Sequence, residues 1–575
     1  MKKILTGILL TFMILQSSVF AERSKITILY TNDIHTHIDN KIKDSSKNMV
    51  PGLTYASVSA LKKELSDSGE DVVLVDSGDF SQGTIYGAED KGKTIIQLMN
   101  DSGFDVATIG NHEFDYGMSV LFENIRKAKF PVVACNFFKG SKLITKPYAI
   151  IKKGNTKIAF IGIATPESLT KASPAIFMDK NKDKVIYNFS EDSTGDKLVR
   201  TIQMAIDDAK TKGKADYVVA LGHLGIDESS KPYRSVDVIQ KISGLDAFID
   251  GHSHSVVEHQ IVKDREGKDV VLSQTGCYLS SIGKMVLEGN DIQTQLITEY
   301  EKKDEFIESK TNSFVKDIDS KMGESFAVND VNFVMRTDDG SDWFVRKHET
   351  NLGDFVADSI YYYINEIEKM PCDIVFMNGG GIRENIPAGS FSYKTAKTVQ
   401  PFGNQVCILN IDGQTVLDVL EFGSRGAGKD AIGGFMQVAG LKFSVDTSVP
   451  STVQIDSKKM WGGKPSAYRV HNVEVYNISE KKYEPLDLNK KYCIGGINFI
   501  IRNMGDGFKM FKNAELVKDY IGEDYIMMCE YAKAFDGKDS NGLPHINTKN
   551  SPLQNYPGYL LNYDTPKGSG RIELK

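Results

Sequence analysis

The sequence has few cysteines, little tryptophan and no excess of basic charge. Six cysteines among 575 residues are too few for a disulfide scaffold, and none stands in a Cys-x-x-Cys pair, which argues against a cysteine-based zinc site. Lysine and arginine number 69 against 76 aspartate and glutamate residues, for a net charge of −7. An acidic chain of this kind is not expected to bind nucleic-acid polymers non-specifically. The hydrophobic share, 41%, is ordinary for globular domains.

Long hydrophobic runs are also absent, apart from one at the N-terminus. Lys2 and Lys3 precede an apolar run over residues 4–15, and Val19 and Ala21 then fit the small-residue pattern of a cleavage site. The run is shorter than the roughly 20 residues that span a bilayer. We therefore expect residues 1–21 to be a signal peptide and the mature chain, from Glu22, to be periplasmic or secreted without a membrane span. An uncleaved anchor is the alternative.

Short apolar runs rich in β-branched residues recur through the first half of the chain. They cover residues 26–30, 72–75, 106–109, 131–134, 158–163, 217–221 and 247–249. Continuous apolar runs of this length predict buried strands. Apolar residues at helical spacing lie between several of them, over residues 53–65, 94–99 and 198–209. Strands that alternate with helices predict a layered α/β domain.

The chain divides near its middle. Residues 298–321 are rich in glutamate and lysine, which is typical of a solvated helix. We expect a first domain over residues 22–300, a helical linker over 301–331 and a second α/β or α+β domain over 332–575.

Five of the predicted strands run into residue types that bind metal ions. In chain order these residues are Asp33 and His35; Asp79; Asn111; His223; and His252 with His254. In open α/β sheets, ligands gather at the carboxyl ends of the strands, so these side chains could converge. Carboxylate, imidazole and amide oxygen together suit divalent ions such as zinc, manganese, magnesium or calcium. Each fragment alone is common in proteins, and the prediction depends on all five occurring at strand ends.

These motifs resemble the signature of the calcineurin-like metallophosphoesterases, and the longer stretches 29–35, 110–117 and 249–254 resemble its 5'-nucleotidase branch. The resemblance implies a four-layer sandwich with two divalent metal ions, one held by Asp33, His35 and His254 and the other by Asn111, His223 and His252, with Asp79 as the bridge. It further implies a metal-activated water as nucleophile. His112 would act on the phosphoryl group, oriented by Asp115; the two lie at i,i+3, which places them on one face of a helical turn.

The second half contains segments that the same family uses to hold the substrate. The stretch 378–383 reads Asn-Gly-Gly-Gly-Ile-Arg, in which backbone N–H groups and an arginine could approach a phosphate. Pro-Phe-Gly-Asn at 401–404 resembles the segment whose aromatic ring stacks on the nucleobase. The resemblance implies these substrate contacts: Arg346, Asn378, Gly380, Arg383, Phe402, Asn404, Phe499 and Asp506. Phe499 stands one place before the family's aromatic position, which Ile500 occupies, and Met504 replaces a glycine.

The sequence therefore predicts an exported, monomeric two-domain nucleotidase that acts on nucleoside 5'-monophosphates. A 2',3'-cyclic-nucleotide 2'-phosphodiesterase/3'-nucleotidase and a UDP-sugar or nucleoside-diphosphate hydrolase share the metal site and remain alternatives. A surface or binding protein without activity is the rival from another class; it predicts an incomplete set of ligands, whereas every ligand position is present. By the same resemblance, the two domains could rotate about the linker to deliver substrate to the metals.

Overall fold

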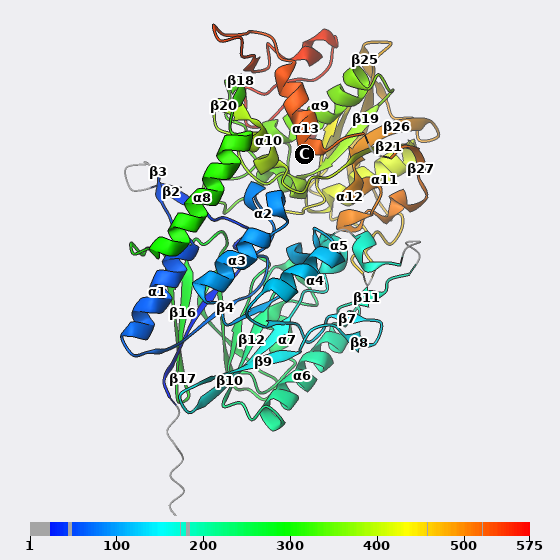
Figure 1. Ribbon diagram of the computed structural model, residues 1–575. Helices are drawn as coiled ribbons and strands as arrows, with labels where there is room; N and C mark the ends of the chain where they lie inside the picture. The colour runs from blue at the N-terminus through cyan, green and yellow to red at the C-terminus, as the bar shows by residue number, and fades with distance from the viewer. Residues whose placement is uncertain (1–23, 44–48, 173, 180–183, 457, 520) are drawn as a thin grey trace, which may run out of the picture.

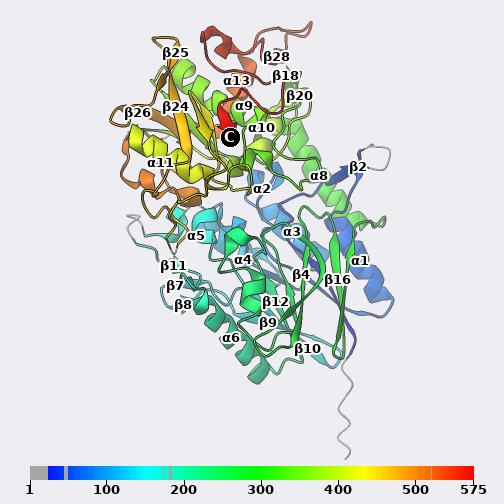
Figure 2. The ribbon, with the colours of Figure 1, turned by 180° about the vertical axis from the view of Figure 1, so that it is seen from behind.

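The computed structural model describes residues 24–43, 49–172, 174–179, 184–456, 458–519 and 521–575. The expected signal peptide, residues 1–21, lies outside the described residues. Two domains lie one above the other in Figure 1, with the N-terminal domain below and the C-terminal domain above. The molecule seen from behind in Figure 2 has the same division.

The N-terminal domain is built on two facing six-stranded sheets. The first has the order β17-β16-β1-β4-β5-β6 and the second the order β14-β15-β13-β12-β10-β9. In the first, β1 (Ile26–Thr31), β4 (Asp71–Asp76), β5 (Val106–Thr108) and β6 (Val132–Val133) are parallel, and β16 (Ile282–Glu288) and β17 (Asp291–Ile297) follow antiparallel. In the second, β10 (Thr156–Ile163), β12 (Tyr217–Gly222), β13 (Ala247–Ile249) and β15 (Asp269–Thr275) are parallel, with β9 (Tyr148–Lys153) and β14 (Val256–Lys263) antiparallel at the edges. All seven strands predicted from apolar runs are present.

Helices cover the outer faces of both sheets and complete four layers. Fully buried Ile28, Val73, Phe160 and Val219 belong to the core between the sheets. Outside the first sheet lie α1 (Tyr55–Asp67), α3 (Lys93–Ser102) and α4 (Met118–Lys127), and outside the second lie α6 (Asp196–Thr211) and α7 (Ser235–Ile239). The short elements are β2 (Lys41–Lys43), β3 (Met49–Pro51), α2 (Ile85–Asp90), the 3-10 turn η1 (His112–Phe114), β7 (Phe138–Lys139), β8 (Lys142–Leu143), α5 (Ser168–Lys171), η2 (Pro174–Phe177), β11 (Tyr187–Asn188) and η3 (Glu228–Ser230). The four-layer α/β sandwich expected from the sequence is confirmed.

Helix α8 (Glu305–Met322) connects the domains and runs along one side of the molecule (Figure 1). It begins where the Asp304 side chain accepts hydrogen bonds from the backbone N–H groups of Phe306 and Ile307, at 3.1 and 3.3 Å. The helix is not solvated all round, because fully buried Ile307 and Ile318 join the core under α1 and α3. The charged linker is therefore anchored on the N-terminal domain by one apolar face.

The C-terminal domain packs its helices on a mixed five-stranded sheet of order β22-β19-β26-β21-β27. Its strands are β19 (Ile374–Asn378), β21 (Val406–Asp412), β22 (Met436–Ala439), β26 (Lys491–Ile497) and β27 (Glu515–Lys518). Two smaller sheets flank it: β18 (Ser325–Asn329), β20 (Gly389–Ser392) and β28 (His545–Ile546); and β23 (Leu441–Val445), β24 (Val470–Asn477), β25 (Lys482–Pro485) and β29 (Ile572–Leu574). The helices are α9 (Asn351–Tyr362), continued by the π-helical η5 (Tyr363–Ile367), α10 (Tyr393–Val399), α11 (Gly413–Gly423), α12 (Asn498–Ile501) and α13 (Asp524–Lys533). The 3-10 turns are η4 (Phe344–Arg346), η6 (Gly379–Gly381), η7 (Ser424–Gly426), η8 (Gly505–Gly507), η9 (Lys509–Asn513) and η10 (Pro552–Asn555).

Ion pairs link the two domains across the space between them. Lys394 of α10 lies 2.6 Å from Asp319 of α8, and Lys397 lies 3.6 Å from Glu89 of α2. On another side of the contact, Lys459 lies 3.9 Å from Glu167. In each pair the lysine belongs to the C-terminal domain and the acid to the N-terminal domain or to α8. These ion pairs connect the two domains at more than one place.

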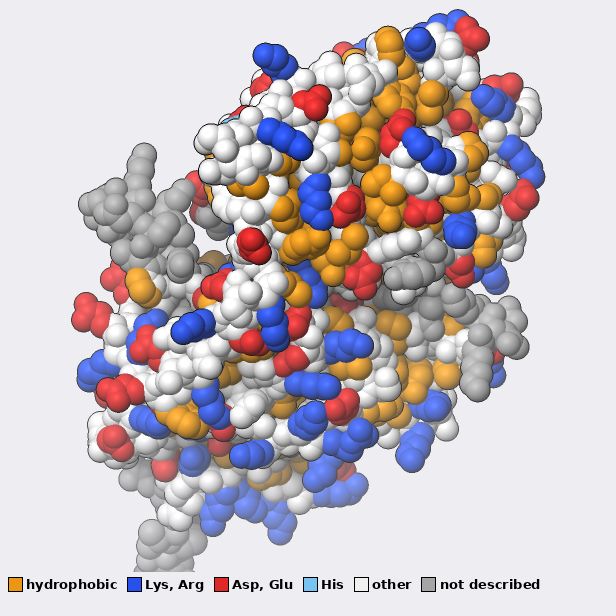
Figure 3. Space-filling model, turned by 45° about the horizontal axis from the view of Figure 1, so that its top comes forward, with side chains coloured by type: hydrophobic (Ala, Val, Ile, Leu, Met, Phe, Trp, Pro, Cys, Tyr) orange, Lys and Arg blue, Asp and Glu red, His pale blue; other side chains and the backbone are white. Residues whose placement is uncertain are grey.

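The surface carries both signs of charge. Acidic and basic side chains are interspersed over the face shown in Figure 3, and hydrophobic side chains form wider areas in its upper part. Within the described ranges, the helices include none with the length and apolar character needed to cross a membrane.

The C-terminus of the chain is tied into its domain by a buried arginine. Arg571 has no exposed surface and donates to Asp358 Oδ2 at 2.8 Å and to the carbonyl oxygens of Val438 and Leu560 at 2.9 and 2.7 Å. Asp358 also accepts from the hydroxyls of Tyr559 and Tyr563, both at 2.7 Å. Removing one member of such a network leaves a buried charge without its partner.

We expect Arg571→Met to destabilise the C-terminal domain by about 3–5 kcal/mol, the usual cost of breaking a buried ion pair from one side. Urea unfolding followed by tryptophan fluorescence measures this domain selectively, since Trp343 and Trp461 are the only two tryptophans in the chain. The matched control is Lys538→Met, an exposed cation of the same domain, which should change the stability by less than about 0.5 kcal/mol. Equal unfolding midpoints for the two variants would contradict the structural role of Arg571.

Candidate active site

The seven candidate metal ligands meet at the carboxyl ends of five strands from both sheets. Three groups of side chains have ligand atoms within 4.8 Å of one another: Asp33, His35 and His254; Asp79, His223 and His252; and His35, Asp79 and His112. Asn111 joins the second group, because its Oδ1 lies 2.8 Å from His252 Nδ1. Asp79 belongs to two groups, and its Oδ2 lies 3.0 Å from His223 Nε2 and 3.7 Å from His35 Nε2.

The backbone around these side chains is unusual. Five candidate ligands have positive φ angles: Asp33 at 49°, His35 at 47°, Asp79 at 59°, His252 at 79° and His254 at 55°. This left-handed region is uncommon for residues other than glycine, and such residues cluster at functional sites, where the surrounding structure supports the cost. The loops that follow the strands therefore point these side chains towards one another at a cost in conformational free energy.

Glycines allow the loops to approach the carboxylates closely. A β-carbon at Gly110 would lie 2.2 Å from Asp79 Oδ1, and one at Gly251 would lie 2.9 Å from Asp33 Oδ2. Both distances are far shorter than a van der Waals contact, so only glycine fits at these two positions.

A buried glutamate of the 110–113 motif, to which the sequence assigned no role, fixes two of the loops. Glu113 accepts hydrogen bonds from the backbone N–H groups of Asp79, Phe80 and Gly110, at 2.8, 2.9 and 2.7 Å. It stands next to His112, but a glutamate after a histidine gives no sign of such a role. Its carboxylate ties the loop after β4 to the loop after β5.

The donor set fits divalent cations. His223 Nε2 is buried and meets no well-aligned hydrogen-bond partner among the described residues, although Asp79 Oδ2 is close. Burial lowers the pKa of His223, but Asp79 and Asp33 outweigh it and raise the pKa to about 10, so positive charge is stabilised at this point. Burial lowers the pKa of His35 and of His254, which leaves both imidazoles neutral, the form that binds metal.

His112 and Asp115 form a pair beside this centre. His112 Nδ1 lies 2.5 Å from Asp115 Oδ2 across the turn η1, as the i,i+3 spacing predicts. The backbone N–H of His112 donates to Asp79 Oδ1 at 2.8 Å. Burial lowers the pKa of His112, but the carboxylates of Asp115 and Asp79 outweigh it and the pKa is raised. The pair thus has the geometry of an imidazole oriented by a carboxylate.

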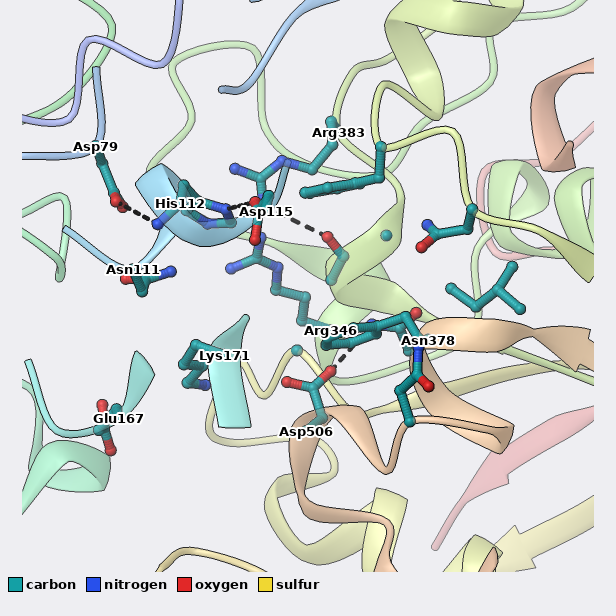
Figure 4. A pocket seen from close by; sticks show the side chains of 18 of the residues that line it. Asp79, Asn111, His112, Asp115, Glu167, Lys171, Arg346, Asn378, Arg383 and Asp506 are labelled. Carbon is teal, nitrogen blue, oxygen red and sulfur yellow. Dashed lines mark hydrogen bonds and ion pairs between the residues drawn. The ribbon is translucent and has the colours of Figure 1, made fainter. Parts of the chain in front are cut away.

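One cavity of about 650 Å³ between the domains joins the two sets of candidate residues. The N-terminal domain contributes six of the predicted site residues to its lining: Asp79, Asn111, His112, Asp115, His252 and His254. The C-terminal domain contributes all eight candidate substrate residues: Arg346, Asn378, Gly380, Arg383, Phe402, Asn404, Phe499 and Asp506. In Figure 4 the guanidinium group of Arg346 lies between the His112–Asp115 pair and the Asn378–Asp506 pair, and the Arg383 side chain lies beside His112 and Asp115. Asp33, His35 and His223 are fully buried beneath the cavity.

Two arginines make the middle of the cavity positive. The Arg346 guanidinium lies 3.9 Å from the centre of the Trp343 ring, and Arg383 lies 5.6 Å from the same ring. Burial, together with repulsion from Arg383, lowers the pKa of Arg346 to about 9. An anion bound here would relieve that repulsion. Trp343 packs against both arginines. Nothing in the sequence around this tryptophan predicts that contact.

The glycine loop supports the arginines, and two of the N–H groups that the sequence suggested for a phosphate are bonded within the protein instead. The N–H of Gly379 donates to Phe435 O and that of Gly380 to Gly433 O, both at 2.8 Å. A β-carbon at Gly379 would lie 2.2 Å from Val345 O, so the glycine lets the segment that carries Arg346 pack against the loop. Gly380 lines the cavity, but its N–H is already bonded within the protein.

Of the two neighbouring residues of α12, Phe499 faces the cavity and Ile500 does not. Phe499 lines the cavity, whereas Ile500 has no exposed surface and joins the core. A β-carbon at Gly505 would lie 2.5 Å from the Phe499 ring, so the ring packs directly on this glycine. Asp506 accepts a hydrogen bond from Asn378 Nδ2 at 3.0 Å, and Asn404 Nδ2 donates to Asp524 at 3.3 Å. Two rings, Phe402 and Phe499, are thus available in one cavity.

Comparison with known families agrees with this architecture. Residues 26–256 match the calcineurin-like phosphoesterase family, and residues 331–513 match the 5'-nucleotidase C-terminal domain. The chain is therefore a phosphoesterase of the calcineurin-like class. With its second domain, it belongs to the 5'-nucleotidase family.

Individual relatives resemble the chain over most of its length. The 5'-nucleotidase of Homo sapiens is 25% identical over 551 residues, which are 88% of this chain and 88% of that protein. The trifunctional nucleotide phosphoesterase protein YfkN of Bacillus subtilis is 24% identical over 559 residues, which are 90% of this chain, but the match spans only 34% of YfkN. The crystal structure of a 5'-nucleotidase precursor from Thermus thermophilus covers 96% of this chain and 99% of its own, with a TM-score of 0.75 and 25% identity. A sulfate thiohydrolase, SoxB, from Thermus shares the fold alone, with a TM-score of 0.66 and 15% identity.

Proposed function

We propose that the chain is an exported nucleotidase that uses two divalent metal ions to hydrolyse nucleoside 5'-monophosphates to nucleoside and phosphate. The observation that carries this proposal is the single cavity lined by both sets of residues. The candidate metal ligands, two arginines and two phenylalanine rings lie within reach of one small phosphorylated molecule. The human relative, which matches over 88% of its own length, is named a 5'-nucleotidase, and this favours 5'-monophosphates over the cyclic nucleotides and UDP-sugars.

The clusters support the ligand assignment that the family resemblance implies. Asp33, His35 and His254 would hold one ion; Asn111, His223 and His252 the other; and Asp79, placed between His35 and His223, would bridge them. When bound, such ions polarise a phosphate ester and lower the pKa of a water molecule towards neutrality. The same ligands accept zinc, manganese, magnesium or calcium, so the donor set does not select one.

The remaining roles belong to residues that line the cavity. Arg346 and Arg383 would bind the phosphate oxygens, for which a guanidinium has matching geometry. Phe402 and Phe499 would hold the nucleobase by stacking, and Asp506 would accept hydrogen bonds from the ribose hydroxyls. His112, oriented by Asp115, would stabilise the phosphoryl group or protonate the leaving oxygen.

The proposal extends to the processing and the domain division of the chain. We place the signal peptide at residues 1–21, the catalytic domain at 22–300, the linker at 301–331 and the substrate domain at 332–575. The position of Ile307 and Ile318 in the N-terminal core, and of Ala327 in the C-terminal core, supports a change of domain within the linker. We further propose a monomer located in the periplasm or outside the cell, whose domains rotate to admit substrate.

The test is phosphate release from 5'-AMP, 3'-AMP, 2',3'-cyclic AMP and UDP-glucose, with and without a chelator. We expect 5'-AMP to be hydrolysed fastest, activity to be lost on chelation, and activity to return when a divalent ion is added back. Activity that chelation leaves unchanged would contradict the metal mechanism. A clear preference for the cyclic or the UDP-linked substrate would keep the mechanism and replace the substrate.

A further inference from the structure

Glu167 lies beside the candidate metal centre but belongs to none of the ligand groups. It follows β10 and immediately precedes α5, and its side chain is only 6% exposed. One carboxylate oxygen, Oε2, lies 2.9 Å from His252 Nε2 and accepts a hydrogen bond from Ser230 Oγ, also at 2.9 Å. The other oxygen, Oε1, lies 3.9 Å from Lys459 Nζ of the C-terminal domain. Each of these three contacts comes from a donor or a cation, and the carboxylate also interacts electrostatically with Lys171 and Asp227.

The contact with Glu167 determines which nitrogen of His252 carries a proton. Glu167 Oε2 already accepts a hydrogen bond from Ser230 Oγ, and a carboxylate oxygen of this kind acts as an acceptor towards its other neighbours. His252 Nε2–H is therefore the donor in this contact, and Nδ1 is the ring nitrogen left to bind a metal ion. That is the nitrogen 2.8 Å from Asn111 Oδ1, on the side of Asp79 and His223.

The same geometry explains a contact that is otherwise unfavourable. His252 Nδ1 without a proton and Asn111 Oδ1 are both electron-pair donors, and at 2.8 Å they repel unless a cation lies beside them. A carboxylate that holds the far nitrogen of a ligating histidine fixes the tautomer and orientation of the ring and raises its basicity.

We propose that Glu167 is a positioning residue for one of the two metal sites. It holds His252 by Nε2–H so that Nδ1 points to the ion shared with Asn111, His223 and Asp79. This inference rests on the metal centre of the proposed function, and it adds a residue that acts through His252 and does not touch the ion. The other metal site, formed by Asp33, His35 and His254, has no contact with Glu167 among the interactions described and should be insensitive to its loss.

The test is the binding of Mn²⁺ to the metal-free full chain, measured by calorimetry, with no substrate present. We expect two sites in the wild-type protein. Glu167→Ala should weaken one of them about 10–100-fold, as is usual when the outer partner of a ligating histidine is removed, and leave the other unchanged. Glu167→Gln should weaken the same site less, because its amide oxygen still accepts a hydrogen bond from Nε2–H.

Two control variants separate the contact with His252 from the loss of charge. Glu228→Gln removes the same charge from the neighbouring turn η3, where the Glu228 side chain is 73% exposed, and should bind Mn²⁺ as the wild type does. Lys459→Met removes the contact from the C-terminal domain without altering the hydrogen bond to His252, and it should also keep both affinities. Circular dichroism of each variant checks that it is folded.

Wild-type affinity at both sites of Glu167→Ala would overturn the proposal, and so would equal weakening of both sites. A loss in Lys459→Met as large as that in Glu167→Ala would overturn it as well, since charge balance would then matter more than the histidine. The proposed function fails separately: a protein that binds two ions with this pattern but releases no phosphate from any nucleotide keeps the role of Glu167 and loses the nucleotidase.

Discussion

Asp79→Asn should lower the rate of phosphate release by about 10³-fold or more and reduce the metal content of the purified protein. The asparagine oxygen can still accept the hydrogen bond from the His112 backbone, so the loop after β4 should keep its shape. What is lost is the charge on Oδ2, which lies between His35 and His223 and so between the two ligand clusters. Charge stabilisation by a bound ion is worth several kcal/mol, and about 1.4 kcal/mol corresponds to each tenfold change in rate.

The measurements for Asp79 are kcat with 5'-AMP and metal content by elemental analysis. Asp67→Asn, an exposed aspartate at the end of α1, is the matched control and should behave as the wild type. If the Asp79→Asn protein still binds two ions and is fully active, Asp79 is not a shared ligand.

His112→Ala should lower kcat by about 10²–10⁴-fold, the usual contribution of a positioned acid or base, and leave the metal content nearly intact. The side chain of His112 faces Asp115 and the cavity, while the candidate ligand set is complete without it. The combination of lost turnover with retained metal separates this variant from Asp79→Asn.

Asp115→Asn is the companion variant, because it keeps His112 and removes the carboxylate that orients it. Its loss of kcat should be smaller than that of His112→Ala, and the double variant should be little worse than His112→Ala alone, as expected for residues that act as a unit. His259→Ala, an exposed histidine of β14 that bonds to Thr294, controls for the loss of an imidazole. Loss of metal from His112→Ala would instead make His112 a ligand, which its place in a cluster with His35 and Asp79 would allow.

The parallel strands make the metal centre predictable from sequence. Each apolar run marks a strand, and parallel strands end at one edge, so residues from Asp33 to His254 converge although they are far apart in the chain. Glu167 obeys the same rule, since it follows the strand over 158–163 after three residues. The sequence does not reveal its role, because Thr-Pro-Glu matches no ligand motif and a hydrogen bond to a histidine has no signature in sequence.

Other features depend on packing, which composition does not reveal. In α8, Ile307 and Ile318 are separated by three turns, which places them on one face, but the glutamates and lysines around them suggest a solvated helix. The glycine loop at 378–383 suggests free N–H groups, and only the structure shows that the N–H groups of Gly379 and Gly380 are bonded to Phe435 and Gly433. Whether Phe499 or Ile500 faces the cavity depends on where the short helix α12 begins, and the sequence pattern does not determine that residue.

Gly110 and Gly251 take no part in the chemistry, yet the structure leaves little room for any other residue at either position. A ligand can be exchanged for another donor with some retained affinity, as a carboxylate can for an amide. At these two glycines every alternative residue brings a β-carbon to within 2.2 Å of Asp79 Oδ1 or 2.9 Å of Asp33 Oδ2. A variant designed for another metal or substrate that keeps the two carboxylates in place must therefore keep glycine at both positions, because the site needs the absence of a side chain there as much as it needs the ligands.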